Sequence, residues 1–397
     1  MSHARGIILC LVLAAGSAAE ENGKAPEPFS HLESVKAFDQ FLESLEELRD
    51  TILLDAVTER EAAEGMRFLL RTVAMAQDVS GDGYPPAPHF ARMDTQRRKV
   101  GGDNPDAEYD NVSWDGKWNY QITGNIGTVD HVSFTFLARQ PTGRSKAIGY
   151  LNERSIGADA QGNFTVWLSA EKPKAGGTWI ETEAGEGSIL VRQYIGDREQ
   201  EKLATYTIEV VDRDHFDPLP PSKDAEVAHG IQSARYGLQT LATLHRIVSP
   251  SLTDEANVFH RLNSDDFGAD ISSSDNLYML GAYAIEADEA LLVEVDALDV
   301  RYWNFAIESP WHESVDYVKR KGSRTHDDVS ADPDGKVRFL VSHLPADHPN
   351  YLETAGHSRG FMTFRWVGER DTQAPLPSVT RLPLAEAVAK GRALGGR

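Results

Sequence analysis

Apolar residues recur at every third or fourth position in three segments of the chain, and this spacing predicts amphipathic helices. The first segment covers residues 34–52. The second begins at Thr58, which forms a capping box with Glu61. The third covers residues 224–248, with Ser222 as its expected N-cap. Apolar stripes of this kind are typical of packed cores, so we interpret all three helices as structural.

Between and after these helices, apolar residues alternate with polar ones, which is the two-residue period of β-strands. Residues 118–122 and 206–210 are two such runs in the first half of the chain, and residues 291–295 and 337–341 are two in the second. Gly, Asp and Pro residues separate the runs, as turns between antiparallel strands require.

The two β-rich parts match each other at a nearly constant offset. Gly162 and Gly335 lie in equivalent turns 173 residues apart, and Ser169 and Ser342 end the following strands at the same offset. A unit of this length is a domain rather than a short repeat, so the sequence predicts a duplicated module. The expected fold class is mainly β with helical additions (α+β). It comprises two tandem related β-sandwich or jelly-roll-like modules, an N-terminal helical segment and a linking helix.

Residues that match between the copies are expected to hold the fold. Arg192 and Arg365 occupy equivalent apolar strands, where a guanidinium must be paired or must lie at an edge. Glu181 and Glu353 also recur in both copies, and they are the candidate partners of these arginines.

The first 19 residues have the three parts of a secretory signal peptide. A short start that contains Arg5 is followed by an apolar run over residues 6–16 and by small residues up to Ala19. The run is too short to span a bilayer, and no later run of about 18 apolar residues occurs. We therefore expect a periplasmic or secreted protein with no membrane span after signal cleavage.

These patterns divide the chain into five parts. They are a signal peptide (1–19), a linker and N-terminal helical segment (20–104), a first β-sandwich module (105–221), a linking helix (222–262) and a second β-sandwich module (263–397).

Composition narrows the classes of partner. The 397 residues carry 61 acidic against 40 basic side chains, a formal net charge of −21, which disfavours nucleic acid. The single cysteine excludes an intrachain disulfide framework and a cysteine-based metal centre. No cofactor is expected. No metal is expected either, because the histidines between residues 343 and 357 match no ligand spacing and Asp327 and Asp328 are typical of a solvated acidic turn.

The clearest difference between the copies is a group of aromatic, imidazole and charged residues found only in the second. Aromatic faces with a few polar groups are typical of small-molecule or sugar pockets. A histidine beside a carboxylate can act as a general acid or base, so His312, His357 and Glu313 are the candidate catalytic residues. The expected ligand-binding residues are Tyr302, Trp303, Asn304, Trp311 and Arg359.

Several stretches of the second half carry a family resemblance. They are Tyr302–Phe305, Trp311–Tyr317, Asp332–Gly335 and Thr354–Gly360, with Arg365 and Trp366. Together they resemble the bacterial domain of unknown function family 1214, and the segment 102–106 is similar to the upstream part of its long members. The resemblance implies a largely β, jelly-roll-like architecture and no established reaction.

Two functions stay open at this level. The first is the binding or processing of a small organic or sugar-like ligand in a pocket of the C-terminal module, with no decision on enzymatic activity. The second is a non-catalytic envelope or assembly protein in which the aromatic rings belong to the core. The oligomeric state is left open.

Overall fold

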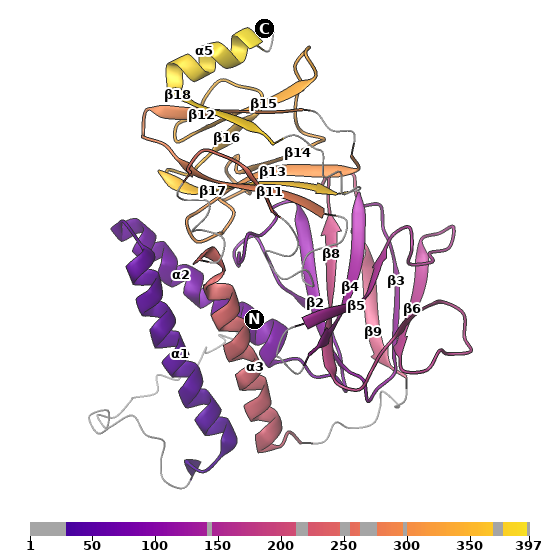
Figure 1. Cartoon of the computed structure of the whole chain (residues 1–397). Coiled ribbons are helices and arrows are strands. Elements are labelled where there is room, and N and C mark those ends of the chain that lie inside the picture. The colour runs from indigo at the N-terminus through magenta and orange to yellow at the C-terminus, as the bar shows by residue number, and fades with distance from the viewer. Residues whose placement is uncertain are drawn as a thin grey trace, which may run out of the picture.

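Two β-sandwiches and a layer of three long helices make up the protein (Figure 1). The computed structural model describes residues 29–140, 145–211, 221–246, 255–262, 276–296, 300–367 and 376–394. The fold is therefore mainly β with helical additions, as predicted. The expected signal peptide lies outside the described residues.

The three predicted helices are present. They are α1 (Glu33–Asp55), α2 (Glu59–Ala76), which continues into the short π-helical turn η2 (Gln77–Gly81), and α3 (Asp224–Ala242). Thr58 caps α2 as predicted, because its hydroxyl accepts a hydrogen bond from the backbone N–H of Glu61 at 3.1 Å. The N-cap of α3 is Lys223 rather than Ser222, and this helix ends before the predicted residue 248.

The first sandwich stacks a five-stranded sheet, in the order β1-β2-β8-β4-β5, on a four-stranded sheet, in the order β7-β6-β3-β9. Its strands are β1 (Ala91–Arg92), β2 (Ala107–Asp115), β3 (Tyr120–Asn125), β4 (His131–Arg139), β5 (Ser145–Asn152), β6 (Asn163–Ser169), β7 (Thr178–Glu181), β8 (Glu186–Tyr194) and β9 (Thr205–Val210). Alternate side chains such as Phe134 and Phe136 of β4 fill the space between the sheets.

The second sandwich stacks β10-β11-β17-β13-β14 on β16-β15-β12-β18. Its strands are β10 (His260–Leu262), β11 (Asn276–Ala284), β12 (Glu289–Asp296), β13 (Tyr302–Glu308), β14 (Ser323–Thr325), β15 (Lys336–Ser342), β16 (Tyr351–Glu353), β17 (Arg359–Val367) and β18 (Ser378–Pro383). A further helix, α5 (Leu384–Leu394), packs against β12, β15 and β18, and the sequence analysis did not predict it.

The two sandwiches have the same topology, strand for strand. Strands β1 to β9 take the same places in the first module as β10 to β18 take in the second. Among the described pairs, each module has one parallel pair, β6 with β7 and β15 with β16. Gly162 and Gly335 occupy equivalent turns with φ of 85° and 80°, a region that favours glycine. The predicted arrangement of two related modules is confirmed.

The module boundaries differ from the prediction at two places. Strand β1 lies inside the range 20–104, which was predicted to be linker and helix, and it pairs with β2. Strand β10 lies inside the range 222–262, which was predicted to be the linking helix, and it pairs with β11. Both strands are only two or three residues long, so their alternation is too short to detect in the sequence.

The predicted Arg–Glu pairs were wrong. Arg365 contacts Glu308 at 3.2 Å, whereas Glu353 pairs with Arg320. Arg192 donates to the hydroxyl of Thr135 at 3.1 Å. The reason is that both arginines belong to the five-stranded sheets, while the two matched glutamates end strands of the four-stranded sheets on the other side of each core.

The outer faces of the two five-stranded sheets are buried as well as the inner ones. Arg192 and Tyr194 in the first module and Thr363 and Arg365 in the second are all at most 5% exposed. The modules meet across these faces, where the side-chain amide of Asn276 donates to the hydroxyl of Tyr194 at 2.6 Å. The helical layer lies beside both sandwiches, and α2 contacts the second one through His357 and Arg359 (Figure 1). The outer face of a sandwich is normally solvated, but in this protein the two outer faces form a further buried region.

Candidate functional site

The predicted aromatic residues do not gather in one place. Trp303 packs in the core of the second sandwich, against Phe339 and Phe364. Trp311 leaves that module and stacks on Phe68 of α2, with ring centroids 6.1 Å apart. Each of these tryptophans is at most 5% exposed, so both serve as packing groups in this structure.

Tyr302 and Asn304 lie on the outer face of β13, where the modules meet. The amide of Asn304 donates to Oδ1 of Asn104 at 2.5 Å, and the ring centroid of Tyr302 is 5.2 Å from that of Tyr194. Both predicted residues are fully buried at the junction. They therefore connect the modules rather than face an open recess.

His357 and Arg359 hold α2 against the second module. Nε2 of His357 is 2.7 Å from the carboxylate of Glu64, and its Nδ1 is 2.9 Å from the carbonyl of Thr354. The guanidinium of Arg359 donates to the carboxylate of Glu61 at 2.6 Å. Both ring nitrogens of His357 are occupied, which leaves no free position for a substrate proton.

His312 differs from His357 because one ring nitrogen has no partner. Its Nδ1 lies 2.5 Å from Oε2 of Glu308, while its Nε2 is buried without a hydrogen-bond partner. The ring stacks on Phe361 at a centroid distance of 4.2 Å and an interplanar angle of 5°. The backbone of His312 has a φ of 57°, an uncommon conformation for a residue other than glycine. Glu308 and stacking together fix the orientation of the imidazole.

Glu308 is the centre of this arrangement, and it is completely buried. Its Oε1 accepts hydrogen bonds from the Thr363 hydroxyl at 2.8 Å and from Arg365 at 3.2 Å. Burial alone would raise the pKa of Glu308, but the interactions with His312, Arg365 and Thr363 outweigh burial and lower it. We call these four residues, Glu308, His312, Thr363 and Arg365, the Glu308–His312 cluster.

Arg365 contributes a second buried atom without a partner. Its Nη2 donates to the carbonyl of Gly102 at 2.7 Å, but its Nη1 has no hydrogen-bond partner. Asp94 lies within electrostatic range of the guanidinium and has an unpartnered buried Oδ1. Burial and the nearby Asp103 raise the pKa of Asp94 well above its usual value. Perturbed groups of this kind concentrate at functional sites.

The loop before β2 fixes the segment that carries His312. The amino group of Lys99 donates to the carbonyls of Ser314 and Val315 at 2.8 and 3.0 Å, and burial lowers its pKa. Asp103 accepts from the backbone N–H of Ser314 at 2.8 Å. The Glu313 carboxylate accepts from Arg71 of α2 at 2.6 Å.

The carboxylate that contacts His312 is not the one expected from the sequence. The sequence analysis expected Glu313 as the catalytic carboxylate, whereas the structure places Glu308 at the ring of His312 and Glu313 at α2. Glu308 ends an apolar strand four residues before His312, and only the reversal of the chain between them brings the groups together. One feature of the sequence could have pointed to Glu308, because it is a charged residue at the end of an otherwise apolar strand. A charged side chain that is buried must be paired.

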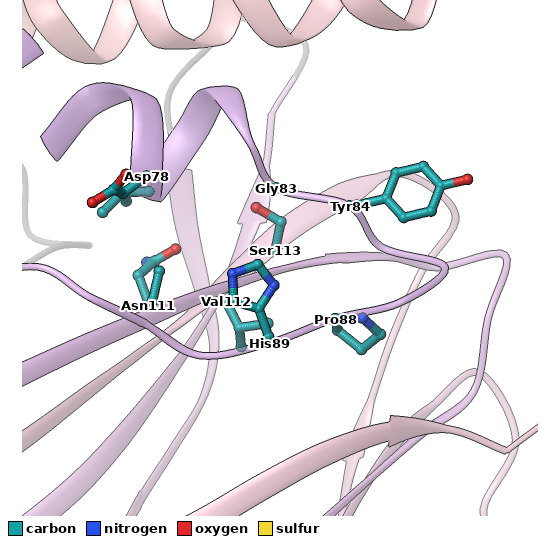
Figure 2. A pocket seen from close by; sticks show the side chains of 10 residues that line it. Asp78, Gly83, Tyr84, Pro88, His89, Asn111, Val112 and Ser113 are labelled. Carbon is teal, nitrogen blue, oxygen red and sulfur yellow. The ribbon is translucent and has the colours of Figure 1, made fainter. Parts of the chain in front are cut away.

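Two hollows among the described residues contain none of the eight predicted site residues. Figure 2 shows the first, between the end of η2 and β2, where Asp78, His89, Asn111 and Ser113 lie around a space of about 10 Å³. That is roughly the room that one water molecule needs. The second is an open groove of about 370 Å³ between α1 and α3.

One group of imidazole and carboxylate side chains among the described residues is close enough to hold a metal ion. It consists of Asp130, His326 and Asp327, and it shares no residue with the Glu308–His312 cluster. In the described part of the chain, no helix is long and apolar enough to cross a membrane.

No family model matches the chain, and no curated protein matches it. Among solved structures, the chain is similar to an uncharacterized protein from Burkholderia cenocepacia. The two are 27% identical over 89% of this chain and 98% of that chain, with a TM-score of 0.81. A Vibrio parahaemolyticus protein is 12% identical over 79% of this chain and 99% of that chain, with a TM-score of 0.48. The first likeness shows a shared fold across both modules, and the second is too weak to extend it.

Proposed function

We propose that the chain is an exported member of the domain of unknown function family 1214 that binds a small hydroxylated or carboxylated organic molecule at the Glu308–His312 cluster. One observation carries this proposal. Nε2 of His312 and Nη1 of Arg365 are both buried without partners, and Glu308 contacts both side chains. Leaving such groups unpaired costs about 1–3 kcal/mol each, and a ligand that pairs them recovers that free energy.

The geometry defines what the ligand must offer. With the Nδ1 proton donated to Glu308, Nε2 of His312 presents a lone pair and accepts a hydrogen bond from a hydroxyl group. Nη1 of Arg365 donates to a carbonyl or carboxylate oxygen. A hydroxy acid or a sugar carries both kinds of group on neighbouring atoms.

The same arrangement allows acid–base chemistry. A carboxylate that orients an imidazole is the device by which histidine takes a proton from a bound hydroxyl and returns it later, and it contributes about 10²–10⁴-fold to a rate. Glu308 stabilises the imidazolium that forms when His312 takes up the proton.

A ligand has to displace the loop that covers the imidazole. The backbone N–H of Gly102 donates to the carbonyl of His312 at 2.7 Å, and a Cβ at position 102 would lie 3.1 Å from Nδ1 of His312. Gly101 and Gly102 both have positive φ, so this loop crosses the ring in a conformation that other residues rarely adopt. Movement about these glycines would open the cluster.

The test is a thermal-shift and calorimetric screen of the chain against sugars, hydroxy acids and small carboxylates. A ligand at 100 times its Kd stabilises the native state by about 2.7 kcal/mol, which is easily measured. We expect His312→Asn, which tolerates the same backbone conformation, to weaken the binding of any hit at least tenfold. The control His229→Gln, on the exposed face of α3, should leave binding unchanged. A hit that binds His312→Asn as tightly as the original chain contradicts the proposal.

A non-catalytic assembly protein is the second candidate, and the burial of the rings favours it. Trp303 and Trp311 pack in the interior, as expected if the sandwiches only form a rigid support. This function predicts that no small molecule in the screen raises the melting temperature and that His312→Asn changes stability alone.

A further inference from the structure

A second group of imidazole and carboxylate side chains lies where the two modules meet. Asp130 directly precedes β4 of the first module, while His326 and Asp327 directly follow β14 of the second. Nε2 of His326 is 3.5 Å from Oδ2 of Asp130 and 3.6 Å from Oδ1 of Asp327. Ligand atoms of all three residues lie within 4.8 Å of one another.

These separations are too long for direct hydrogen bonds and fit the edges of a coordination polyhedron. A charge-assisted N–H···O bond is about 2.7–2.9 Å long. Histidine nitrogen and carboxylate oxygen bind Zn²⁺ at about 2.0–2.2 Å, which makes the ligand–ligand edge of a tetrahedron about 3.4 Å. The His326 contacts of 3.5 and 3.6 Å are close to that edge.

Two further observations point to a ligand between these groups. Oδ2 of Asp130 is buried and has no hydrogen-bond partner. Gly196 leaves the space in front of the carboxylates open, because a Cβ at this position would lie 2.4 Å from Oδ2 of Asp130 and 2.5 Å from Oδ2 of Asp327. A larger residue would fill the position that these oxygens share.

Glu201 holds the loop of the first module in place. Its Oε1 accepts from the backbone N–H groups of Gly196 and Asp197 at 3.0 and 2.9 Å, and Oε2 accepts from that of Asp130 at 3.3 Å. Glu201 is thus a positioning residue for Asp130. Burial and the negative charges of Glu201 and Asp327 raise the pKa of Asp130 to about 6, although His326 and Arg301 oppose this rise.

One basic side chain near this site, Arg301, acts on Asp130 through its charge. Arg301 pairs with Glu153 of the first module, which also lies 3.0 Å from Nδ1 of His131. The carboxylates of Asp130 and Asp327 repel each other, and the imidazole of His326 and the charge of Arg301 offset this repulsion only in part. A divalent cation would offset the repulsion between these two carboxylates.

We propose that Asp130, His326 and Asp327 form a binding site for a divalent transition-metal ion of the zinc or manganese type, which joins the two modules. One nitrogen and two oxygen ligands suit these ions, and solvent would complete the coordination. The ligands come from both modules, so the ion binds the folded pair and stabilises it. This site is separate from the Glu308–His312 cluster and does not depend on the proposed function.

The test uses the full chain after treatment with a chelator. Equilibrium dialysis against Zn²⁺ with elemental analysis should give one ion per chain, and Zn²⁺ should raise the melting temperature. Co²⁺ in its place should give the visible absorption of a low-coordinate nitrogen and oxygen site. We expect His326→Gln and Asp327→Asn to weaken binding at least tenfold. The control is His229→Gln, which removes an exposed histidine 3.2 Å from Glu186 without a third ligand.

Gly196→Ala is the second variant, and it removes no ligand atom. The added Cβ would displace at least one carboxylate, so Zn²⁺ binding should fall while circular dichroism shows an unchanged fold. The proposal is overturned if the original chain binds no ion at a tenfold molar excess of Zn²⁺. It is equally overturned if Asp327→Asn and Gly196→Ala bind the ion as tightly as the original chain.

Discussion

Two histidines in this protein each contact a carboxylate, but they differ in whether the second ring nitrogen has a hydrogen-bond partner. His357 is satisfied on both nitrogens, by Glu64 and by a backbone carbonyl, so it joins α2 to the second module. His312 is satisfied by Glu308 on one nitrogen only. The two imidazoles are buried to a similar extent, and the free nitrogen separates a structural histidine from a candidate functional one.

At the residue scale we predict a pH dependence that arises from Glu64. Burial would raise its pKa, but the hydrogen bond and charge of His357, with those of Arg60, lower it from 4.5 to about 2. A carboxylate with a lowered folded pKa stabilises the protein above pH 4.5, and this contribution is lost as the pH falls toward 2. Glu64→Gln should be less stable at neutral pH by about 1.5–3 kcal/mol, and its stability should fall less steeply across that window.

Urea unfolding between pH 2 and pH 7 measures this effect. Glu46→Gln, on the exposed face of α1, is the control and should keep the original slope. An unchanged acid slope in Glu64→Gln would show that the pair with His357 does not form in solution.

At the scale of elements, α2 is the connector between the helical layer and the second module. It carries Glu61, which accepts from Arg359, and its backbone carbonyl at Glu61 accepts from the indole N–H of Trp311 at 3.0 Å. Helix α1 also packs on α2, and its Ile52 is completely buried where Trp311 meets α2. The close approach of Trp311 and Ile52 requires a position without a side chain, which is Gly65.

We predict that Gly65→Ala destabilises the protein although alanine is the better helix former. In an open helix this change gains about 0.8–1.0 kcal/mol. Here the new Cβ would lie 2.4 Å from Cγ2 of Ile52 and 2.8 Å from the ring of Trp311, and overpacking costs about 1–3 kcal/mol. Urea unfolding should therefore show a net loss of stability. Gly176→Ala, where nothing lies within 4 Å, is the matched control, and a stabilised Gly65→Ala would contradict the packing described.

At the scale of the whole molecule, the two sandwiches bury each other's outer faces, so they should not unfold separately. Asn304 of β13 donates to Asn104 in the loop before β2, and Asn104 in turn donates to the hydroxyl of Tyr302 at 3.1 Å. Polar contacts of this kind specify how two buried faces fit, because an unpaired amide in such a place is costly.

We predict that Asn304→Ala lowers the stability of both modules together. The loss leaves Asn104 short of a partner and should cost about 1–3 kcal/mol. Native-state hydrogen exchange should then quicken to the same extent for the amides of β4 and of β13. Thr123→Ala, on the exposed face of β3, should change neither. Faster exchange in β13 alone would show that the modules open independently.

The sequence was a good guide wherever structure depends on neighbours along the chain. The three long helices, the capping by Thr58 and the duplicated turns at Gly162 and Gly335 follow from local periodicity and backbone preference. The two-residue strand β1 and the three-residue strand β10 were not predicted, because such short runs show no hydrophobic period. For the candidate site, the sequence had named His312, whereas the contacts of Glu308 and Arg365 were found only in the structure.

By itself the sequence determined the two related modules. The alternation of apolar and polar residues and the choice of turn residues are local properties, and both recur in each copy. Only the tertiary structure decided which buried groups meet. The contacts of Glu308 with Arg365 and of Asp130 with His326 join segments far apart in the chain. They depend on how two sheets and two modules are placed on each other. Pairing of charges in an interior is a property of that placement, and no spacing along a single chain encodes it.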